Sequence, residues 1–150
     1  MFICENNDLA IHSKVKDRSL QKNHYKFAEV FKIQNKFYKD NDIVKLCKSL
    51  KKDISSVKNK QKPLFIEIKT NRWLEHVGPN EDWYMGYRNK KISNSFLNDD
   101  PLTKLSRQIN KTKKRQISNT VEREIRLALN YAKKSKFPKK EEVFKHVFKK

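Results

Sequence analysis

Side chains that could do chemistry are concentrated in one stretch of the chain, residues 63–88. This stretch, PLFIEIKTNRWLEHVGPNEDWYMGYR, holds both glycines and both tryptophans of the 150-residue sequence, together with Arg72, His76 and Arg88. Glycine is used where the backbone takes a positive φ or approaches another group closely. Loops on a rigid scaffold are also where binding and catalytic groups are usually found. This stretch is therefore the first candidate for a functional site.

Two predicted strands must position this loop and a second polar loop. Residues 63–69 are nearly continuous in apolar side chains, which is typical of a parallel strand buried on both faces. Residues 2–4 form a shorter apolar run that stops at the polar turn Asn6-Asn7-Asp8. The sequence thus predicts two strands that each end in a polar loop.

The elements between these strands predict an α/β fold. Residues 9–22 have no sustained period and are predicted to be a loop, whereas residues 25–31 have helical spacing. Residues 36–39 are a candidate strand, and Asp42 can cap a helix whose apolar positions run from 43 to 57. This order indicates a parallel sheet, whose ligands bind outside the carboxyl ends of the strands. We therefore expect the two polar loops to converge on one site.

The C-terminal third is predicted to be helical. Asp99 and Asp100 before Pro101 form a helix start signal, and this helix is expected to continue through residue 109. A second helix is predicted over residues 119–134, capped by Asn119 with Glu122, and Pro138 ends it. Its apolar face is interpreted as core or subunit interface. That face consists of Val121, Ile125, Ala128, Leu129 and Ala132.

The chain is strongly basic. Lys and Arg number 36 against 17 acidic residues, which gives a formal charge of +19. Such a balance raises nucleic-acid binding as an alternative function, because lysines neutralise phosphates. The lysines run through every segment instead of forming one arm or stripe, so a solvated basic surface is the preferred interpretation.

The cysteines and the hydropathy of the chain indicate the kind of compartment in which the protein is found. Cys4 and Cys47 lie in apolar surroundings without metal-site spacing, which predicts two buried thiols in a reducing compartment. Trp73 and Trp83 are interpreted as packing anchors. No apolar stretch approaches the roughly 20 residues of a membrane span, and the first residues lack the pattern of a signal peptide. We expect a cytoplasmic protein with no membrane partner.

Four segments, in order and with compatible spacing, resemble the alpha subunits of the thiamine-diphosphate-dependent 2-oxo acid dehydrogenases (the pyruvate, branched-chain and acetoin types). FICENNDLAIHS looks like the end of the thiamine-diphosphate motif, and FKIQNKFYKDND looks like the stretch with a strand and then Asp-Gly-Asn-Asp. PLFIEIKTNRWLEHVGPNEDWYMGYR is similar to the second signature, with Thr-x-Arg, a histidine and a later Tyr-Arg. LNDDPLTKL resembles the Asp-Pro that opens the next helix. The resemblance implies a partial three-layer thiamine-diphosphate-binding fold with parallel strands and C-terminal helices, as a single domain over residues 1–150.

The resemblance also implies roles for individual residues. Asn7 matches the asparagine whose side-chain oxygen coordinates Mg²⁺ on the cofactor diphosphate, and an amide oxygen suits this hard cation. Leu9 matches the residue that supplies a backbone carbonyl to the metal. His76 matches the loop histidine beside the diphosphate at the mouth of the active site, and Arg72 and Arg88 match the loop arginines.

Simpler interpretations of these residues remain open. Asn7 could form only an Asx turn after a strand. His76 could be an ordinary surface histidine, and Arg72 could pair with Glu67 or Glu75.

The sequence also departs from the family. The Gly-Asp-Gly segment that opens the thiamine motif is absent, and its aspartate would be the second protein ligand of the metal. Val77 stands where the mitochondrial pyruvate enzymes have a phosphorylatable serine, so that control is not expected here. We therefore expect the C-terminal half of an alpha subunit, from a truncated or split gene. The implied partners are a beta subunit in a heterotetramer, a separately encoded N-terminal half and a lipoyl-bearing acyltransferase.

The expected function is that of an oxidoreductase subunit. The reaction would be thiamine-diphosphate-dependent oxidative decarboxylation of a 2-oxo acid, or cleavage of acetoin, with acyl transfer to a lipoyl group. The isolated chain is expected to be inactive because half of its metal site is missing. The alternative is a basic nucleic-acid-binding protein without catalysis.

Overall fold

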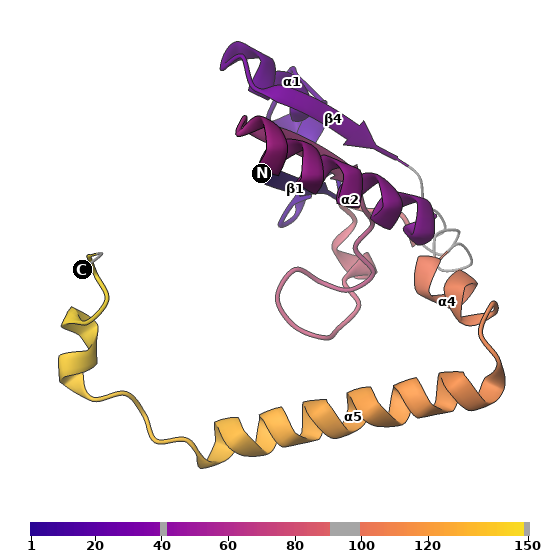
Figure 1. Ribbon diagram of the computed structural model, residues 1–150, viewed down its shortest axis with the longest axis vertical. Helices are drawn as coiled ribbons and strands as arrows, with labels where there is room; N and C mark the ends of the chain where they lie inside the picture. The colour runs from indigo at the N-terminus through magenta and orange to yellow at the C-terminus, as the bar shows by residue number, and fades with distance from the viewer. Residues whose placement is uncertain (40–41, 91–99, 149–150) are drawn as a thin grey trace. The chain divides into compact units, whose positions relative to one another are not determined.

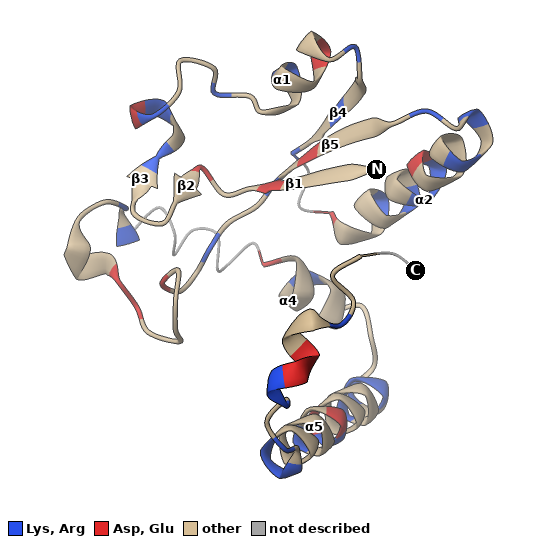
Figure 2. Ribbon diagram, turned by 90° about the vertical axis from the view of Figure 1, so that its left-hand side faces the viewer, with Lys and Arg blue, Asp and Glu red and all other residues tan. Residues whose placement is uncertain are grey.

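The computed structural model describes residues 1–39, 42–90 and 100–148. The chain divides into two compact units, Met1–Arg107 (unit 1) and Gln108–Lys150 (unit 2). Figure 1 shows the elements along the chain. Lys and Arg lie on α2 of unit 1 and on α5 of unit 2 alike, as the even spread of lysine along the sequence predicted (Figure 2).

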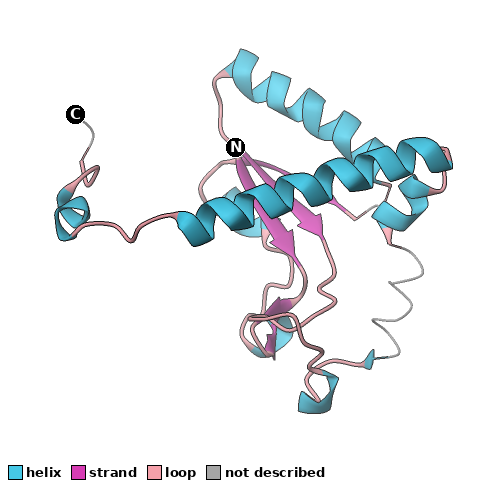
Figure 3. Cartoon of the chain, turned by 90° about the horizontal axis from the view of Figure 1, so that it is seen from below, coloured by secondary structure: helices cyan, strands magenta, loops and turns pink. Residues whose placement is uncertain are grey.

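Unit 1 is built on three parallel strands in the order β1-β5-β4, which are labelled in Figure 2 and drawn in magenta in Figure 3. β1 spans Phe2–Asn6, β4 spans Gln34–Tyr38 and β5 spans Leu64–Lys69. The central strand β5 pairs in parallel with both neighbours, and Leu64 and Ile66 are buried. The prediction of a buried parallel strand over residues 63–69 is confirmed.

Helices α1 and α2 cover opposite faces of this sheet. Lys36 of β4 binds the Asp53 carboxylate of α2 (Ile43–Lys60), so α2 lies on the face of Lys36. Successive strand residues face opposite sides. The next residue, Phe37, stacks on Tyr25 of α1 (Tyr25–Val30) with ring centroids 5.5 Å apart. A helical layer on each face of a parallel sheet is the α/β fold that the sequence predicted.

Helix α2 begins as its sequence predicted. The Asp42 side chain accepts hydrogen bonds from the backbone N–H of Val44 and Lys45, at 3.0 and 3.1 Å. These bonds satisfy N–H groups that have no partner within the helix. Gln61 takes a left-handed conformation, with φ of 52°, and ends the helix.

Two predictions for the first half of unit 1 need correction. The predicted loop at 9–22 contains a short antiparallel hairpin, β2 (Leu9–Ala10) with β3 (Ser13–Lys14), followed by the 3₁₀ helix η1 (Val15–Asp17). Strands of two residues are too short to give a periodic pattern. The predicted strand at 36–39 begins earlier, at Gln34, because backbone pairing with β5 includes its polar first residues.

The start of α4 (Pro101–Ser106) is as predicted. Asp100 accepts a hydrogen bond from Thr103 N at 2.8 Å and caps the helix, while Asp99 lies outside the described residues. The helix ends at Ser106 and not at Ile109.

The predicted start of the last long helix is wrong. Helix α5 spans Lys111–Lys134, and its cap is Asn110, whose Oδ1 accepts from Lys113 N at 2.8 Å. Asn119 is inside the helix. A polar first turn has no apolar period, so the sequence pattern located only the later turns. The chain then forms a 3₁₀ helix, η3 (Lys140–Phe144).

Several residues expected in a core are exposed. Val121, Ile125 and Leu129 of α5 are 48%, 54% and 55% exposed, so this stripe is not a core of unit 2. Cys47 is exposed on α2 and Cys4 is half-buried, which corrects the prediction of two buried thiols. Both tryptophans are half-buried. No helix in the described ranges is long and apolar enough to cross a membrane.

Candidate functional site

The loops that follow β1 and β5 lie side by side at the carboxyl edge of the sheet. The two strands pair in register as far as Asn6 and Lys69, and Thr70 N then donates to Asn6 O at 2.9 Å. Lys69 also forms an ion pair with Asp8 of the first loop. The expected convergence of the two loops is confirmed.

Arg72 links the two loops. Its Nη1 and Nη2 atoms both donate to the Ile11 carbonyl, each at 3.2 Å, and the side chain is 14% exposed. Arg72 also donates to the Tyr87 hydroxyl and lies 3.5 Å from the Asp82 carboxylate. The suggested pairing of Arg72 with Glu67 or Glu75 is therefore wrong.

Asp82 is the centre of the loop after β5. Its carboxylate is fully buried and accepts from Arg88 Nε at 2.8 Å, from Arg88 Nη2 and from the Tyr87 hydroxyl. Arg88 further donates to the carbonyls of Arg72 and Trp73, at 2.6 and 3.0 Å. These five residues form what we call the Asp82 cluster. The sequence-based prediction missed Asp82, although two arginines in one loop are a signal that a carboxylate must balance them.

The electrostatics of the cluster favour the ionised carboxylate. Burial alone raises the pKa of Asp82, but hydrogen bonds from Tyr87 and Arg88 and the charges of both arginines outweigh it. The pKa of Asp82 is therefore below its ordinary value. Burial, followed by the hydrogen bond to Asp82, raises the pKa of the Tyr87 hydroxyl. Tyr87 thus stays protonated and donates to Asp82 at neutral pH.

Aromatic rings pack around the same charges. The Arg88 guanidinium carbon lies 4.0 Å from the centroid of the Trp83 ring, which is cation–π geometry. The His12 ring, from the β2–β3 hairpin, lies 4.9 Å from Tyr87. The half-buried tryptophan is thus an anchor for an arginine.

Both glycines have the geometry that their use in the loop suggested. Gly78 has a φ of 116° and Gly86 a φ of 74°, conformations that are strained for other residues. A Cβ at Gly78 would also collide with the Glu75 carboxylate, which accepts from the backbone and side chain of Asn80, at 3.1 and 3.0 Å.

Asn7 lies in a pair of consecutive Asx turns. Its Oδ1 accepts from Leu9 N at 2.9 Å, and Asn6 Oδ1 accepts from Asp8 N at 2.8 Å. Asn7 therefore forms the Asx turn that the simpler interpretation predicted. A carbonyl oxygen has two lone pairs, so the turn leaves acceptor capacity on Asn7 Oδ1.

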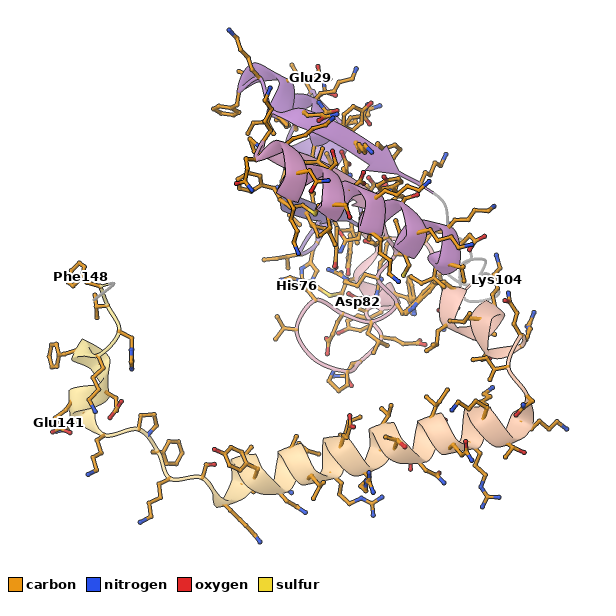
Figure 4. All side chains as sticks on the ribbon, in the orientation of Figure 1. Glu29, His76, Asp82, Lys104, Glu141 and Phe148 are labelled. Atoms are coloured by element: carbon orange, nitrogen blue, oxygen red, sulfur yellow. The ribbon has the colours of Figure 1, made fainter. Side chains whose placement is uncertain are left out.

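His76 lies apart from the Asp82 cluster. It is exposed in the loop that also carries Asp82 (Figure 4). Among the described residues it makes no hydrogen bond, ion pair or ring contact. The structure thus brings Arg72 and Arg88 together, places Asn7 and Leu9 at the adjoining turn, and leaves His76 accessible.

The buried carboxylate of Glu67, on β5, holds the end of β1 where the first loop begins. Glu67, 1% exposed, accepts from Asn6 Nδ2 at 2.5 Å and from Tyr25 N at 2.8 Å. His24 Nδ1 lies 3.6 Å from the same carboxylate. Asn6 is therefore a structural residue that holds the end of β1, whereas Asn7 beside it points its oxygen into the turn. In the described part of the chain, no three His, Cys, Asp or Glu side chains form a metal-binding group.

Comparison with known proteins gives a result consistent with this geometry. The family described as "Dehydrogenase E1 component" matches residues 1–141. The chain is 22% identical over 154 residues to the pyruvate dehydrogenase E1 component subunit alpha of Rickettsia bellii. This match covers 99% of the chain but 46% of the relative, so the chain spans about half the length of that subunit. The chain belongs to the dehydrogenase E1 component family.

Proposed function

We propose that the chain is the C-terminal, loop-bearing portion of an alpha subunit of a thiamine-diphosphate-dependent 2-oxo acid dehydrogenase. The reaction would be oxidative decarboxylation of a 2-oxo acid, or acetoin cleavage, with acyl transfer to a lipoyl group. The observation that supports this most is the link between the two loops, in which Arg72 binds the Ile11 carbonyl. It joins the two motif-bearing loops at the edge of a parallel sheet where ligands bind.

The residues present fit one side of a Mg²⁺-diphosphate site. The Asn7 amide oxygen and the Leu9 carbonyl are oxygen donors in one turn, and Mg²⁺ takes oxygen ligands while keeping several waters. Two oxygens are too few for a complete site. The remaining ligands would come from the diphosphate, from water and from the aspartate of a Gly-Asp-Gly segment, which residues 1–150 do not contain.

The chain's own residues would position the cofactor and restrict access to it. Asn7 and Leu9 would hold the metal, and Arg72 would keep the loop after β5 against the metal-binding turn. His76, accessible on that loop, would face the diphosphate. Thiamine diphosphate, when bound, supplies the carbanion that attacks the oxo carbon.

We propose the partners that this role requires. A beta subunit would complete the active site in a heterotetramer, and a lipoyl-bearing acyltransferase would receive the acyl group. The proposed compartment is the cytoplasm.

Nuclear magnetic resonance titration of the whole chain with thiamine diphosphate and Mg²⁺ tests the proposed site. Shifts are expected in residues 6–11 and 70–78, and they should require both ligands. Asn7→Ala should weaken the response by roughly tenfold, the loss of one metal ligand. Asn23→Ala is the matched control, since Asn23 is a half-buried loop asparagine outside the two loops. Equal responses from both variants would contradict the assignment of Asn7.

Assays of the purified chain test the expectation of inactivity. Without added subunits, no thiamine-dependent decarboxylation of pyruvate or a branched 2-oxo acid is expected. Turnover by the chain alone would show that the proposed dependence on partners is wrong. The comparisons do not favour the nucleic-acid alternative, and a salt-dependent gel shift would detect it directly.

A further inference from the structure

The buried carboxylate of Glu67 is connected to the proposed metal-binding turn through the side chain of Asn6. Glu67 lies on the central strand β5 and is 1% exposed. Both of its oxygens are used, since Oε2 accepts from Tyr25 N at 2.8 Å and Oε1 accepts from Asn6 Nδ2 at 2.5 Å. A buried carboxylate is costly unless its oxygens are hydrogen-bonded, so Glu67 holds both of these partners in place on β5.

The partners of the Asn6 amide fix its orientation. An ionised Glu67 can only accept, so it faces Nδ2, and Asp8 N can only donate, so it faces Oδ1, at 2.8 Å. His24 Nδ1 lies 3.3 Å from Nδ2 and accepts its second hydrogen in the tautomer that leaves Nδ1 unprotonated. Asn6 itself is 7% exposed. An aspartate at this position would have no donor for Glu67.

The hydrogen bond from Asp8 to Asn6 reaches the residue between the two proposed metal donors. Asp8 follows Asn7 and precedes Leu9, and its φ of 62° is a left-handed conformation that costs free energy in a residue other than glycine. Its N–H is held by Asn6 Oδ1, and its carbonyl accepts from Val15 N at 3.0 Å. These two bonds therefore set the course of the backbone between the two donors.

We propose that Glu67 is a positioning residue for the metal-binding turn. Through Asn6 it holds Asp8 in its left-handed conformation, and this sets where the Asn7 side-chain oxygen and the Leu9 carbonyl lie. The inference rests on the proposed function, because these two oxygens are the donors proposed there for Mg²⁺. Removing a group that orients a metal ligand typically weakens metal binding by roughly 10- to 100-fold.

A purely structural role for Glu67 gives a different expectation. In that role the carboxylate would only join β1, β5 and α1, so its loss would lower the stability of the chain. The affinity of the chain that remains folded for Mg²⁺ would stay the same. Metal affinity, measured separately from stability, therefore distinguishes the two roles.

Titration of the whole chain with Mg²⁺ in the presence of thiamine diphosphate, monitored by nuclear magnetic resonance of residues 6–11, measures this affinity. Glu67→Gln should raise the Kd for Mg²⁺ by at least about tenfold, because a glutamine offers one acceptor oxygen to two donors. Asn6→Asp should raise it by a similar factor, because two carboxylates then face each other and Glu67 loses its donor. If charge alone mattered, the added negative charge of Asn6→Asp would instead tighten Mg²⁺ binding.

The double variant, Asn6→Asp with Glu67→Gln, exchanges donor and acceptor. The glutamine then accepts from Tyr25 N and donates to the aspartate, which still accepts from Asp8 N. Its Kd should return to within about threefold of the wild-type value, a coupling that two independent sites would not show. This variant also tests the proposal where a single variant does not fold, since a folded double variant with a Kd raised by about tenfold would overturn it.

Asp53→Asn is the matched control. It removes the charge of an equally buried carboxylate, on α2, that accepts from Lys36 and Tyr38. It should lower the urea midpoint of unfolding but leave the Kd for Mg²⁺ within about twofold. Without any ligand, the Asp8 amide should exchange at least about tenfold faster in Glu67→Gln than in the wild type, and at the wild-type rate in Asp53→Asn.

The outcomes separate this role from the proposed function. A wild-type response to Mg²⁺ and thiamine diphosphate that Glu67→Gln or Asn6→Asp leaves within about twofold would overturn the positioning role alone. An equal loss of affinity from Asp53→Asn would overturn it as well. No response from the wild type would contradict the proposed function itself, and the role of Glu67 toward the metal with it.

Discussion

Asp82 and Arg88 form a buried pair, with Arg88 Nε 2.8 Å from Asp82 Oδ1. Asp82 is fully buried and the Arg88 side chain is 7% exposed, so bulk water screens this pair only weakly. Arg88 in turn donates to the carbonyls of Arg72 and Trp73 at the start of the same loop. Arg88, held by Asp82, thus closes the loop from residue 72 to residue 88.

Asp82→Asn should destabilise the folded chain by about 3–5 kcal/mol, because it leaves two buried arginines without a counter-charge. Urea unfolding of the whole chain measures this, and hydrogen exchange should show the largest loss of protection over residues 72–88. Glu81→Gln is the control with the same charge change, since the pair of Glu81 with Lys90 is exposed. That control should cost less than about 1 kcal/mol. Equal effects would show that the buried pair does not stabilise the loop.

The same pair predicts how stability depends on pH. The folded-state pKa of Asp82 is below its ordinary value, near 3.9 in unfolded chains, because Tyr87 and the arginines outweigh its burial. Its contribution is therefore fully present above that ordinary value and is lost as the pH falls through the lower folded-state pKa. The difference in unfolding free energy between the wild type and Asp82→Asn should be constant from pH 7 to about pH 5 and shrink below about pH 4. A constant difference at pH 3 would contradict this assignment.

A second buried carboxylate fixes α2 on the sheet. Asp53, 1% exposed, accepts from the Tyr38 hydroxyl at 2.6 Å and from Lys36. Asp53→Asn should cost about 2–3 kcal/mol, since hydrogen bonds to a charged group are lost or weakened. Asp17→Asn, at an exposed aspartate, should change stability by less than about 0.5 kcal/mol. Thermal unfolding, monitored by circular dichroism, distinguishes the two variants. Similar unfolding midpoints for both would count against the role of Asp53.

Two asparagines of the last long helix give a direct test of where it begins. Asn110 caps α5, so Asn110→Ala should reduce helix stability by about 1 kcal/mol. Asn119 is inside the helix, where alanine is the better helix former, so Asn119→Ala should stabilise it by about 0.5 kcal/mol. Hydrogen exchange of the α5 amides measures both changes in helix stability. The opposite pattern would support a helix that begins at Asn119.

Much of the fold followed from local patterns. The apolar run at 64–68 predicted the central strand, and Asp42 and Asp100 predicted the helices that they cap. These features are local, because a strand buried on both faces must be apolar and a helix start needs an acceptor for its free N–H groups. The start of α5 did not follow, since the polar turn after Asn110 carries no apolar period.

The sequence by itself determined the parallel sheet, its two polar loops and the arginines, asparagine and histidine that they carry. Only the tertiary structure decided which of these residues meet. Arg72 could have paired with several carboxylates near it in sequence, but chain reversal brings it to Asp82 and to the Ile11 carbonyl, 61 residues away along the chain. The burial of Asp82 and the accessibility of His76 were likewise decided by long-range packing. Their physical reason is the same: desolvation and pairing depend on which segments come together, and local sequence periodicity does not specify that.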